Sequence, residues 1–410
     1  MSWLIWLYTV IFFFGIYFML MFLMLYFRNK KDLNYYPKPT KFPFVSLITP
    51  AYNEEKSVAE TINALLKLDY PKDKLEIIVV NDGSTDKTKE IVMEFVKKYD
   101  RVKLLNKKNS GKADSLNQAI ERAKGELITV VDADSYPTPQ TLKRMIGFFE
   151  EDEKVAAVTS KVWVKNNTNK FIERFQDVDY AVIAWSRKIL DFIGCVYVTN
   201  GPFSVYRKDK VLEVGGFDVT NITEDIELTW NLLSHGYKTK MSYAAKVYTL
   251  VPDNLEVWRK QRVRWNLGGL QTLNKYRNYF LRGENLFGYF VMSYVSVSFI
   301  LSFLGLFLLS RYFYLRFAPY VFSLPYFFEG YNPFLFFDFY IPFTLLLMFG
   351  IVFLILSVSY HKLTLKGTEV KNKSIRTILV YTFIYRPLYL IPLVISIYKL
   401  IKGDIRWYTK

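Results

Sequence analysis

Cysteine and histidine are almost absent from this sequence. The lone Cys195 excludes a disulfide within the chain, and the two histidines, His235 and His361, are too widely separated to form a usual zinc site with it. Any bound metal ion must therefore rest on oxygen ligands. With so little histidine, a carboxylate is also the expected general base.

The chain as a whole is neither strongly polar nor strongly apolar. Of its 410 residues, 51% are hydrophobic and 22% are charged, which excludes a disordered or fibrous protein and a bundle made only of membrane helices. The 54 lysines and arginines outnumber the 38 acidic residues and give a net charge of +16. We expect these cations to line an anionic membrane surface. Nucleic acid is the competing partner, and the sequence contains no nucleic-acid-binding motif.

The N-terminus predicts a membrane-spanning helix. Residues 3–27 contain no charged side chain, and a helix of roughly 25 residues extends roughly 37 Å, enough to cross the hydrocarbon core of a bilayer. Basic residues follow this segment and none precedes it, which argues against a cleaved signal peptide. The positive-inside rule places the chain after residue 28 in the cytoplasm.

Long apolar segments return in the C-terminal third. Residues 288–310 and 339–360 are long enough to span, and residues 311–338 are expected to lie outside or in the interface. Residues 378–401 are interrupted by Arg386 and two prolines, so a broken or re-entrant helix is an alternative to a simple span. We predict three to five spans in a multi-pass protein of the cell membrane.

An α/β domain is predicted between the membrane segments. Short β-branched segments at 44–49, 75–80, 102–105 and 127–131 alternate with stretches typical of capped helices. This pattern predicts an open, mostly parallel sheet with helices on both faces. Ligands of such sheets bind beyond the carboxyl ends of the strands, so the residues after each strand form the candidate site.

Acidic and amide side chains follow three of these strands, at 50–54, 81–86 and 132–134. Each segment alone is ordinary turn chemistry. Together they bring carboxylates to one edge of the sheet, where their repulsion requires a cation or hydrogen-bond donors. Asp132 and Asp134 can direct two carboxylates toward one Mg²⁺ or Mn²⁺ ion, for which a diphosphate is the natural partner.

Two later helix starts supply further candidates. Lys112 lies at the beginning of a predicted helix over 113–122, where backbone amides and an ammonium group can meet phosphate oxygens. Asn221 and Glu224 resemble a helix N-cap with its N3 carboxylate. That interpretation leaves Asp225 unexplained, and we expect it to face a cleft as a general base.

The basic segment after residue 254 is typical of an amphipathic helix that rests on the membrane. Within it, Gln261, Arg264 and Trp265 fall on one helical face and could converge on a sugar diphosphate and an acceptor. Residues 170–190 are a second amphipathic candidate, whose default role is packing or interface contact.

Four motifs in this order resemble those of processive family 2 glycosyltransferases. They are Asp82, Asp-Ala-Asp at 132–134, Thr-Glu-Asp at 223–225 and Gln-Arg-Val-Arg-Trp at 261–265. With Gly-Pro-Phe-Ser-Val-Tyr-Arg at 201–207, the chain is most similar to bacterial poly-N-acetylglucosamine synthases, and hyaluronan, chitin and cellulose synthases share the same pattern. The resemblance covers about residues 44–273 and the flanking spans.

The resemblance implies a GT-A fold that uses a UDP-sugar, with a role for each matching residue. The uracil and ribose region would be held by Ala51, Tyr52, Glu54 and Asp82. The diphosphate and the metal ion would contact Asp132 and Asp134. Asp225 would be the catalytic base, with Glu224 beside it. The groups that close over the diphosphate and the acceptor would be Gln261, Arg262, Arg264 and Trp265.

The predicted organisation has six parts. They are a transmembrane helix at 1–27, a linker at 28–43, a cytosolic GT-A domain at 44–254, an amphipathic interface region at 255–287, a membrane region at 288–401 and a basic tail at 402–410. The leading hypothesis is an inverting, metal-dependent enzyme that polymerises UDP-N-acetylglucosamine into a β-linked polysaccharide and moves the product through its spans. A small accessory membrane subunit is a further candidate partner.

Two other functions compete with this hypothesis. The first is a transferase that adds a single sugar from a UDP-sugar to a lipid at the inner leaflet, and product length distinguishes it from a polymerase. The second is a membrane receptor or channel that binds a nucleotide sugar without turning it over. The intact set of carboxylates disfavours this last alternative.

Overall fold

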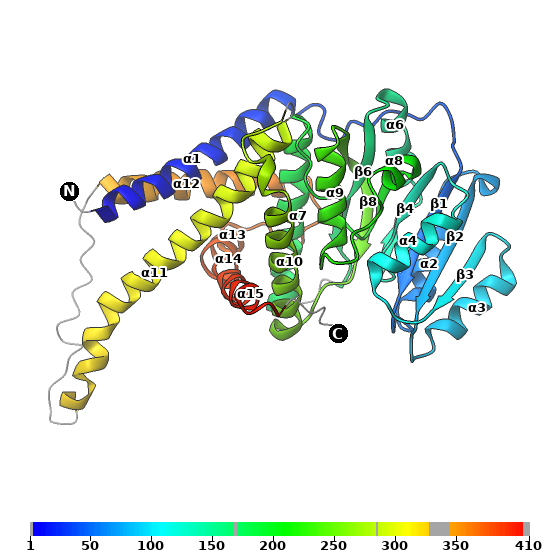
Figure 1. Cartoon of the computed structure of the whole chain (residues 1–410). Helices are drawn as coiled ribbons and strands as arrows, with labels where there is room; N and C mark the ends of the chain where they lie inside the picture. The colour runs from blue at the N-terminus through cyan, green and yellow to red at the C-terminus, as the bar shows by residue number, and fades with distance from the viewer. Residues whose placement is uncertain (1–2, 167–169, 284–285, 328–344, 405–410) are drawn as a thin grey trace.

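The computed structural model describes residues 3–166, 170–283, 286–327 and 345–404, and shows an α/β domain joined to a group of long helices (Figure 1). The N-terminal helix, α1 (Trp3–Asn29), lies beside the C-terminal helix α12 (Leu345–Leu365). The α/β domain lies between them in sequence.

The domain is built on one eight-stranded sheet with the strand order β3-β2-β1-β4-β7-β6-β8-β5. Its strands are β1 (Val45–Ala51), β2 (Leu75–Asp82), β3 (Val102–Lys107), β4 (Leu127–Val130), β5 (Ser135–Pro137), β6 (Val155–Val164), β7 (Ser204–Arg207) and β8 (Lys238–Thr249). The first four strands are parallel, β7 runs antiparallel to β4 and β6, and β6 is parallel to β8. The predicted mostly parallel α/β sheet is confirmed.

Helices cover both faces of the sheet because successive strand residues point to opposite sides. In β1, Leu47 packs toward α2 (Val58–Leu66) and α3 (Thr88–Lys98), whereas Ile48 packs toward α4 (Lys112–Arg122) and α9 (Glu224–Ser234). Short elements complete the domain. They are η1 (Lys72–Lys74), α5 (Lys143–Ile146), α6 (Phe148–Glu151) and α8 (Lys208–Glu213).

Four helical segments of the described chain are long and apolar enough to cross a membrane. They are Ile5–Asn29, Phe287–Leu308, Met348–Leu365 and Ile375–Lys402. The second begins with a π-helical turn, η3 (Phe287–Val291), and continues as α11 (Met292–Phe327). Residues 311–327, which we expected to lie outside the spans, therefore prolong this helix, and the rest of that segment, 328–338, lies outside the described residues.

The last apolar segment is broken, as its arginine and prolines predict. It consists of α13 (Ile375–Val380), the π-helical turn η5 (Tyr381–Tyr385), α14 (Arg386–Leu388) and α15 (Leu390–Lys402). Of the predicted basic tail, residues 405–410 lie outside the described residues.

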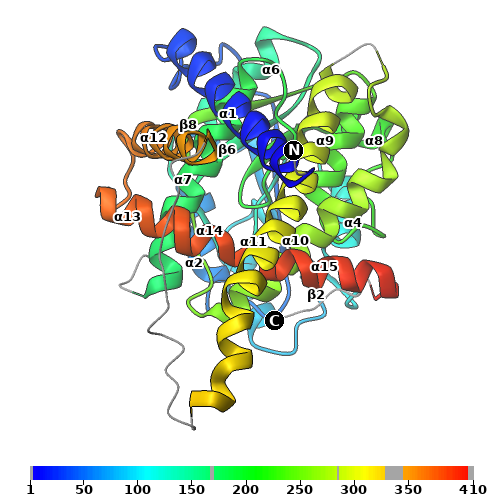
Figure 2. The ribbon, with the colours of Figure 1, turned by 90° about the vertical axis from the view of Figure 1, so that its left-hand side faces the viewer.

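Two amphipathic helices connect the domain to these segments. The predicted helix over 170–190 is α7 (Phe171–Asp191), and the predicted basic helix is α10 (Leu255–Lys275), followed by the short η2 (Arg277–Tyr279). Trp185 of α7 is buried with Phe22 of α1 and Trp230 of α9. Trp258 of α10 is buried with Tyr385 of η5. Figure 2 shows α14 and α15 running past α7 and α10.

Candidate active site

Lys112 lies at the centre of the predicted acidic edge. Its Nζ is 2.7 Å from Oδ1 of Asp132, which follows β4, and 2.8 Å from Oε1 of Glu224, the first residue of α9. Burial would lower the pKa of Lys112, but the surrounding carboxylates raise it above its ordinary value. The lysine is therefore a permanent cation that links two elements of the domain.

The turn before β7 packs directly against this ion pair. A Cβ on Gly201 would lie 2.7 Å from Oδ2 of Asp132 and 2.9 Å from Nζ of Lys112. Only glycine lets the backbone approach so closely. We predicted that the backbone at this turn approaches a ligand closely, and in the structure it approaches the ion pair of Lys112 and Asp132.

Asp225 stands next to Glu224 in the first turn of α9 and is half-buried. Burial and the neighbouring charge of Glu224 raise the pKa of its carboxyl group, the cations of Lys112 and Arg264 oppose this rise, and the resulting pKa is about 6. A carboxylate with a pKa close to neutral is suited to accept a proton at physiological pH.

Asp82, at the end of β2, is buried and holds the loop that leads into α4. Its two carboxylate oxygens accept hydrogen bonds from the backbone amides of Ser110 (3.0 Å) and Gly111 (2.9 Å). The ammonium group of Lys107 donates a third hydrogen bond of 2.6 Å. Asp82 therefore fixes the position of the loop that carries Lys112.

The segment after β1 lies at the same sheet edge, because Ala51 pairs with Asn81 in the parallel register. Ala51 is buried and Tyr52 is half-buried. Glu54 accepts a 2.6 Å hydrogen bond from Ser57 through Oε2. The structure thus brings the segment assigned to the uracil and ribose region beside Asp82.

Asp134 lies slightly apart from this centre. Its Oδ1 accepts a long hydrogen bond of 3.4 Å from the hydroxyl of Thr249, and its charge raises the pKa values of Tyr136 and Tyr180 after the larger effect of burial. Within the described ranges, no group of three or more histidine, cysteine or acidic side chains is arranged to hold a metal ion by itself. Asp132 and Asp134 supply the hard oxygen atoms that Mg²⁺ and Mn²⁺ prefer, and a bound diphosphate must supply further ligands.

The two arginines of the α10 motif face different parts of the structure. Arg264 is close enough to Asp225 to act on its ionisation. Arg262, only 1% exposed, instead faces Asp179 of α7, with Nη2 at 3.5 Å from Oδ2. Its guanidinium carbon is 4.0 Å from the ring centroid of Trp265, and its Nη1 donates a 3.0 Å hydrogen bond to Gln261. The structure therefore does not bring Arg262 into the acidic cluster, by which we mean Asp132, Glu224 and Asp225 around Lys112.

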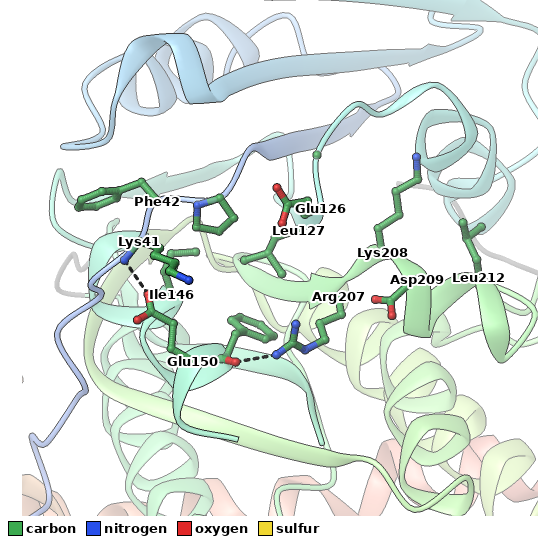
Figure 3. Close-up of a pocket in the computed structure, with 13 residues that line it drawn as sticks. Lys41, Phe42, Glu126, Leu127, Ile146, Glu150, Arg207, Lys208, Asp209 and Leu212 are labelled. Carbon is green, nitrogen blue, oxygen red and sulfur yellow. Dashed lines mark hydrogen bonds between the residues drawn. The ribbon is translucent and has the colours of Figure 1, made fainter. Parts of the chain in front are cut away.

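A cavity of about 730 Å³ lies at the opposite edge of the sheet (Figure 3). It is lined by the chain before β1, the start of β4, α6 and the end of β7. Its charged groups are engaged in structural contacts: Arg207 donates to the carbonyl oxygen of Phe149, and Glu150 accepts from the amide of Lys41. The acidic cluster lies beyond the other end of β4, so this cavity is separate from it.

Comparison with known proteins identifies the domain that carries this cluster. Residues 46–214 match the family model described as glycosyl transferase family 2. The chain contains a family 2 glycosyltransferase domain. The matched segment holds Asp82, Lys112 and the two aspartates after β4, and Asp225 and α10 follow it.

Two relatives place this glycosyltransferase domain in a wider context. The probable glycosyltransferase YdaM of Bacillus subtilis is 28% identical over 382 residues, which cover 90% of this chain and 86% of that protein. The poly-β-1,6-N-acetyl-D-glucosamine synthase of Staphylococcus epidermidis is 34% identical over 230 residues, which cover 56% of this chain and 55% of the synthase. The alignment thus spans about half the length of the synthase.

A solved structure confirms the fold of the glycosyltransferase over almost the whole chain. The mannosyltransferase PcManGT from Pyrobaculum calidifontis, determined in complex with GDP-Man and Mn²⁺, superposes with a TM-score of 0.60 at 20% identity. The match covers 96% of this chain and 99% of that chain. At this identity the likeness concerns the fold alone.

Sequence reasoning did not assign functional residues within α7 of the glycosyltransferase. Asp179, Tyr180 and Arg187 all face charged groups of the site or of α14, yet the segment was expected only to pack. These three residues are not distinctive in the sequence, because α7 also carries other charged residues such as Glu173 and Lys188. Their partners lie far away in sequence, so the pattern alone could not show what they meet.

Proposed function

We propose that this protein is a membrane glycosyltransferase that transfers sugar units from a UDP-sugar, with UDP-N-acetylglucosamine as the expected donor and a β-linked polysaccharide as the expected product. The choice of donor and product is supported by the 34% identity to poly-N-acetylglucosamine synthases. The four long apolar helices support attachment to a bilayer, with the catalytic domain on the cytoplasmic side.

The observation that carries the proposal is the position and ionisation of Asp225. Its carboxyl group combines a pKa of about 6 with proximity to the cations of Lys112 and Arg264. In the proposed reaction, Asp225 takes the proton from an acceptor hydroxyl as that oxygen bonds to the anomeric carbon. The bond from this carbon to the diphosphate breaks, and its electron pair leaves with UDP, so the configuration is inverted.

The residues around Asp225 have supporting roles. Arg264 and Lys112 offset the negative charge that develops on the leaving diphosphate. When bound, Mg²⁺ or Mn²⁺ would be held by Asp132 and Asp134 and would neutralise part of the same charge. Asp82 keeps the loop before α4 in place, so that Lys112 and the amides at the helix start face the donor.

The test is transfer by the purified protein in detergent. Donors would be a panel of UDP-sugars together with GDP-mannose, because a protein of the same fold was determined with GDP-Man and Mn²⁺. Release of nucleotide and the mass of the product are measured with Mg²⁺ or Mn²⁺. We expect a series of product masses spaced by one sugar, whereas addition of a single sugar would support the alternative function.

The role of Asp225 is tested by Asp225→Asn against the matched control Asp209→Asn, which changes an exposed aspartate of α8. Loss of a general base is expected to reduce kcat by about 10²–10⁴-fold while donor binding is retained. The control should behave as the unchanged protein. Substantial turnover by Asp225→Asn would exclude Asp225 as the base.

A further inference from the structure

Three arginine side chains converge on the membrane side of the active site. Arg187 belongs to α7, Arg262 to α10 and Arg386 to α14, which runs past the other two helices in Figure 2, and both Arg262 and Arg386 face Asp179 of α7. We call these three residues the arginine cluster. They come from parts of the chain as much as 199 residues apart, so their meeting is a property of the fold and not of one basic segment.

A single carboxylate, that of Asp179, lies between two members of the cluster. It is 3.5 Å from Nη2 of Arg262 and 3.7 Å from Nη1 of Arg386. Both ion pairs are long because the carboxylate already accepts hydrogen bonds from the hydroxyls of Tyr381, at 2.8 Å, and Tyr389. The two guanidinium groups are thus only partly neutralised.

The donors of Arg262 are incompletely satisfied. Its side chain is 1% exposed, and among the described residues its Nε and Nη2 have no hydrogen-bond partner. Its charge is met only by the 3.5 Å ion pair with Asp179 and by the rings of Trp265 and Tyr389, so the guanidinium group retains hydrogen-bonding capacity for a further acceptor. An anion delivered by a ligand would satisfy it.

The other two members are more exposed than Arg262. The side chain of Arg386 is 54% exposed although it faces Asp179 and the rings of Tyr381 and Tyr389. Within the described part of the chain, Arg187 makes no side-chain hydrogen bond or ion pair, and it is half-buried. Tyr197 interacts electrostatically with both arginines, so both lie near its hydroxyl.

The cluster adjoins the catalytic centre. Arg187 interacts electrostatically with Asp225 and with Tyr180, and Tyr180 interacts with Arg262 and with Asp134. A ligand group held by the arginines would therefore lie next to the proposed base and on the side of the domain that faces the apolar helices.

Charge decides which ligand fits. Three guanidinium groups against the carboxylate of Asp179 leave two uncompensated positive charges, since Asp225, the other acid near the cluster, also faces Lys112 and Arg264. A neutral sugar chain would leave this charge unmatched. A diphosphate diester carries two negative charges, and arginine binds phosphate oxygens through two parallel hydrogen bonds.

We propose that the arginine cluster binds the diphosphate group of a lipid-linked sugar and holds this acceptor beside Asp225. The inference rests on the proposed function, because it names the acceptor of that reaction. The chemical step is unchanged: Asp225 takes the proton of the acceptor sugar's hydroxyl, and the new bond forms at the anomeric carbon as UDP leaves. The lipid tail would extend among the apolar helices.

The experiment compares two acceptors with one donor. The first acceptor is a polyprenyl diphosphate carrying N-acetylglucosamine, presented in phosphatidylcholine vesicles, and the second is a short neutral oligomer of N-acetylglucosamine in solution. The variants are Arg187→Gln, Arg187→Lys and Arg386→Gln, with Arg376→Gln, an exposed arginine of α13, as the matched control. Melting temperatures confirm that each variant is folded.

We expect Arg187→Gln and Arg386→Gln to raise KM for the lipid acceptor by about tenfold to hundredfold, the effect of losing a hydrogen bond to a charged group. The KM for the donor should not change in either variant, and Arg386→Gln should also keep the rate with the neutral oligomer. Arg187→Gln is judged by KM alone, because Arg187 interacts with Asp225. Arg187→Lys should restore part of the affinity, because it keeps the charge but not the paired hydrogen bonds. The control should match the unchanged protein.

Three results with the variants or with other ligands would overturn the assignment of the cluster. They are an unchanged KM in both glutamine variants, equal competition by phosphatidylglycerol vesicles, and dependence on Arg187 only when the acceptor sugar carries a carboxylate. Failure of the unchanged protein with both acceptors would instead contradict the proposed function. Extension of the neutral oligomer without use of the lipid acceptor would refute the proposed role of the arginine cluster but not the proposed function.

Discussion

Two adjacent glycines of α10 allow the contact between this helix and the catalytic segment to be tested. A Cβ on Gly268 would lie 2.1 Å from Oγ1 and 2.5 Å from Cγ2 of Thr223, the residue before Glu224 and Asp225. A Cβ on Gly269 would have Phe299 as its nearest neighbour, at 3.8 Å, an ordinary contact distance. The variants Gly268→Ala and Gly269→Ala therefore differ mainly in that only the first displaces Thr223.

The magnitudes follow from opposing effects. Replacing glycine by alanine within a helix contributes about 1 kcal/mol of stability, so Gly269→Ala should be slightly stabilising. Gly268→Ala has the same gain but adds an overpacking cost of about 1–3 kcal/mol. Thr223 cannot easily give way, since it is 2% exposed and its hydroxyl donates a 3.3 Å hydrogen bond to Asn221.

Activity should respond more strongly than stability. Displacing Thr223 moves the start of α9, and a misplacement of about 1 Å in a catalytic group costs about 10²-fold in rate. We expect Gly268→Ala to lose at least about tenfold in kcat for nucleotide release, while Gly269→Ala keeps it. If the two variants had equal rates and equal free energies of unfolding, the close contact of α10 with Thr223 could not be what positions Asp225.

Three further predictions concern titrating and buried charges. The pKa of Asp225 is about 6, and only its deprotonated form accepts a proton. In a pH–rate profile, kcat should therefore rise through about pH 6 and level off above it. A profile that is flat from pH 5 to 8 would contradict this role. Burial lowers the pKa of Lys161 to about 7, so the unfolded chain binds more protons between pH 7 and 10 and stability should rise over that interval. Denaturant titrations at several pH values should show that Lys161→Met abolishes this rise. The variant should be most stabilised, relative to the wild-type protein, below pH 7. Asp82→Asn breaks a buried ion pair with Lys107 and should lower the free energy of unfolding by about 3 kcal/mol, whereas an unchanged denaturation midpoint would show that the pair is not needed.

The sheet and its acidic edge could be predicted because they depend on local patterns. The β-branched segments before residue 131 became β1 to β4, and parallel pairing places their carboxyl ends together. This geometry alone brings Asp82 and Asp132 to one edge. The position of Lys112 between two acids also follows from its place at a helix start beside that edge.

The division of the α10 motif could not be predicted from the sequence. Helical spacing shows that Arg262 and Arg264, two residues apart, must point in different directions. It does not show which of them meets the active site, because the partners Asp179 and Tyr389 come from α7 and from the segment before α15. Long-range packing decides this, whereas the five-residue motif at 261–265 gave both arginines the same role.

The position of α7 explains why the catalytic domain and the apolar helices work as one unit. One part of this helix, around Trp185, is buried against α1 and α9, and another, around Phe175, is buried against η5. Asp179, which faces α14, lies between them, and Arg187, which interacts electrostatically with Asp225, lies just beyond Trp185. A shift of the apolar helices would therefore be transmitted to the base through a single packed helix. In the proposed reaction, the acceptor side of the site is complete only when the domain and these helices are docked, so that transfer would take place at the surface where a lipid-borne acceptor arrives.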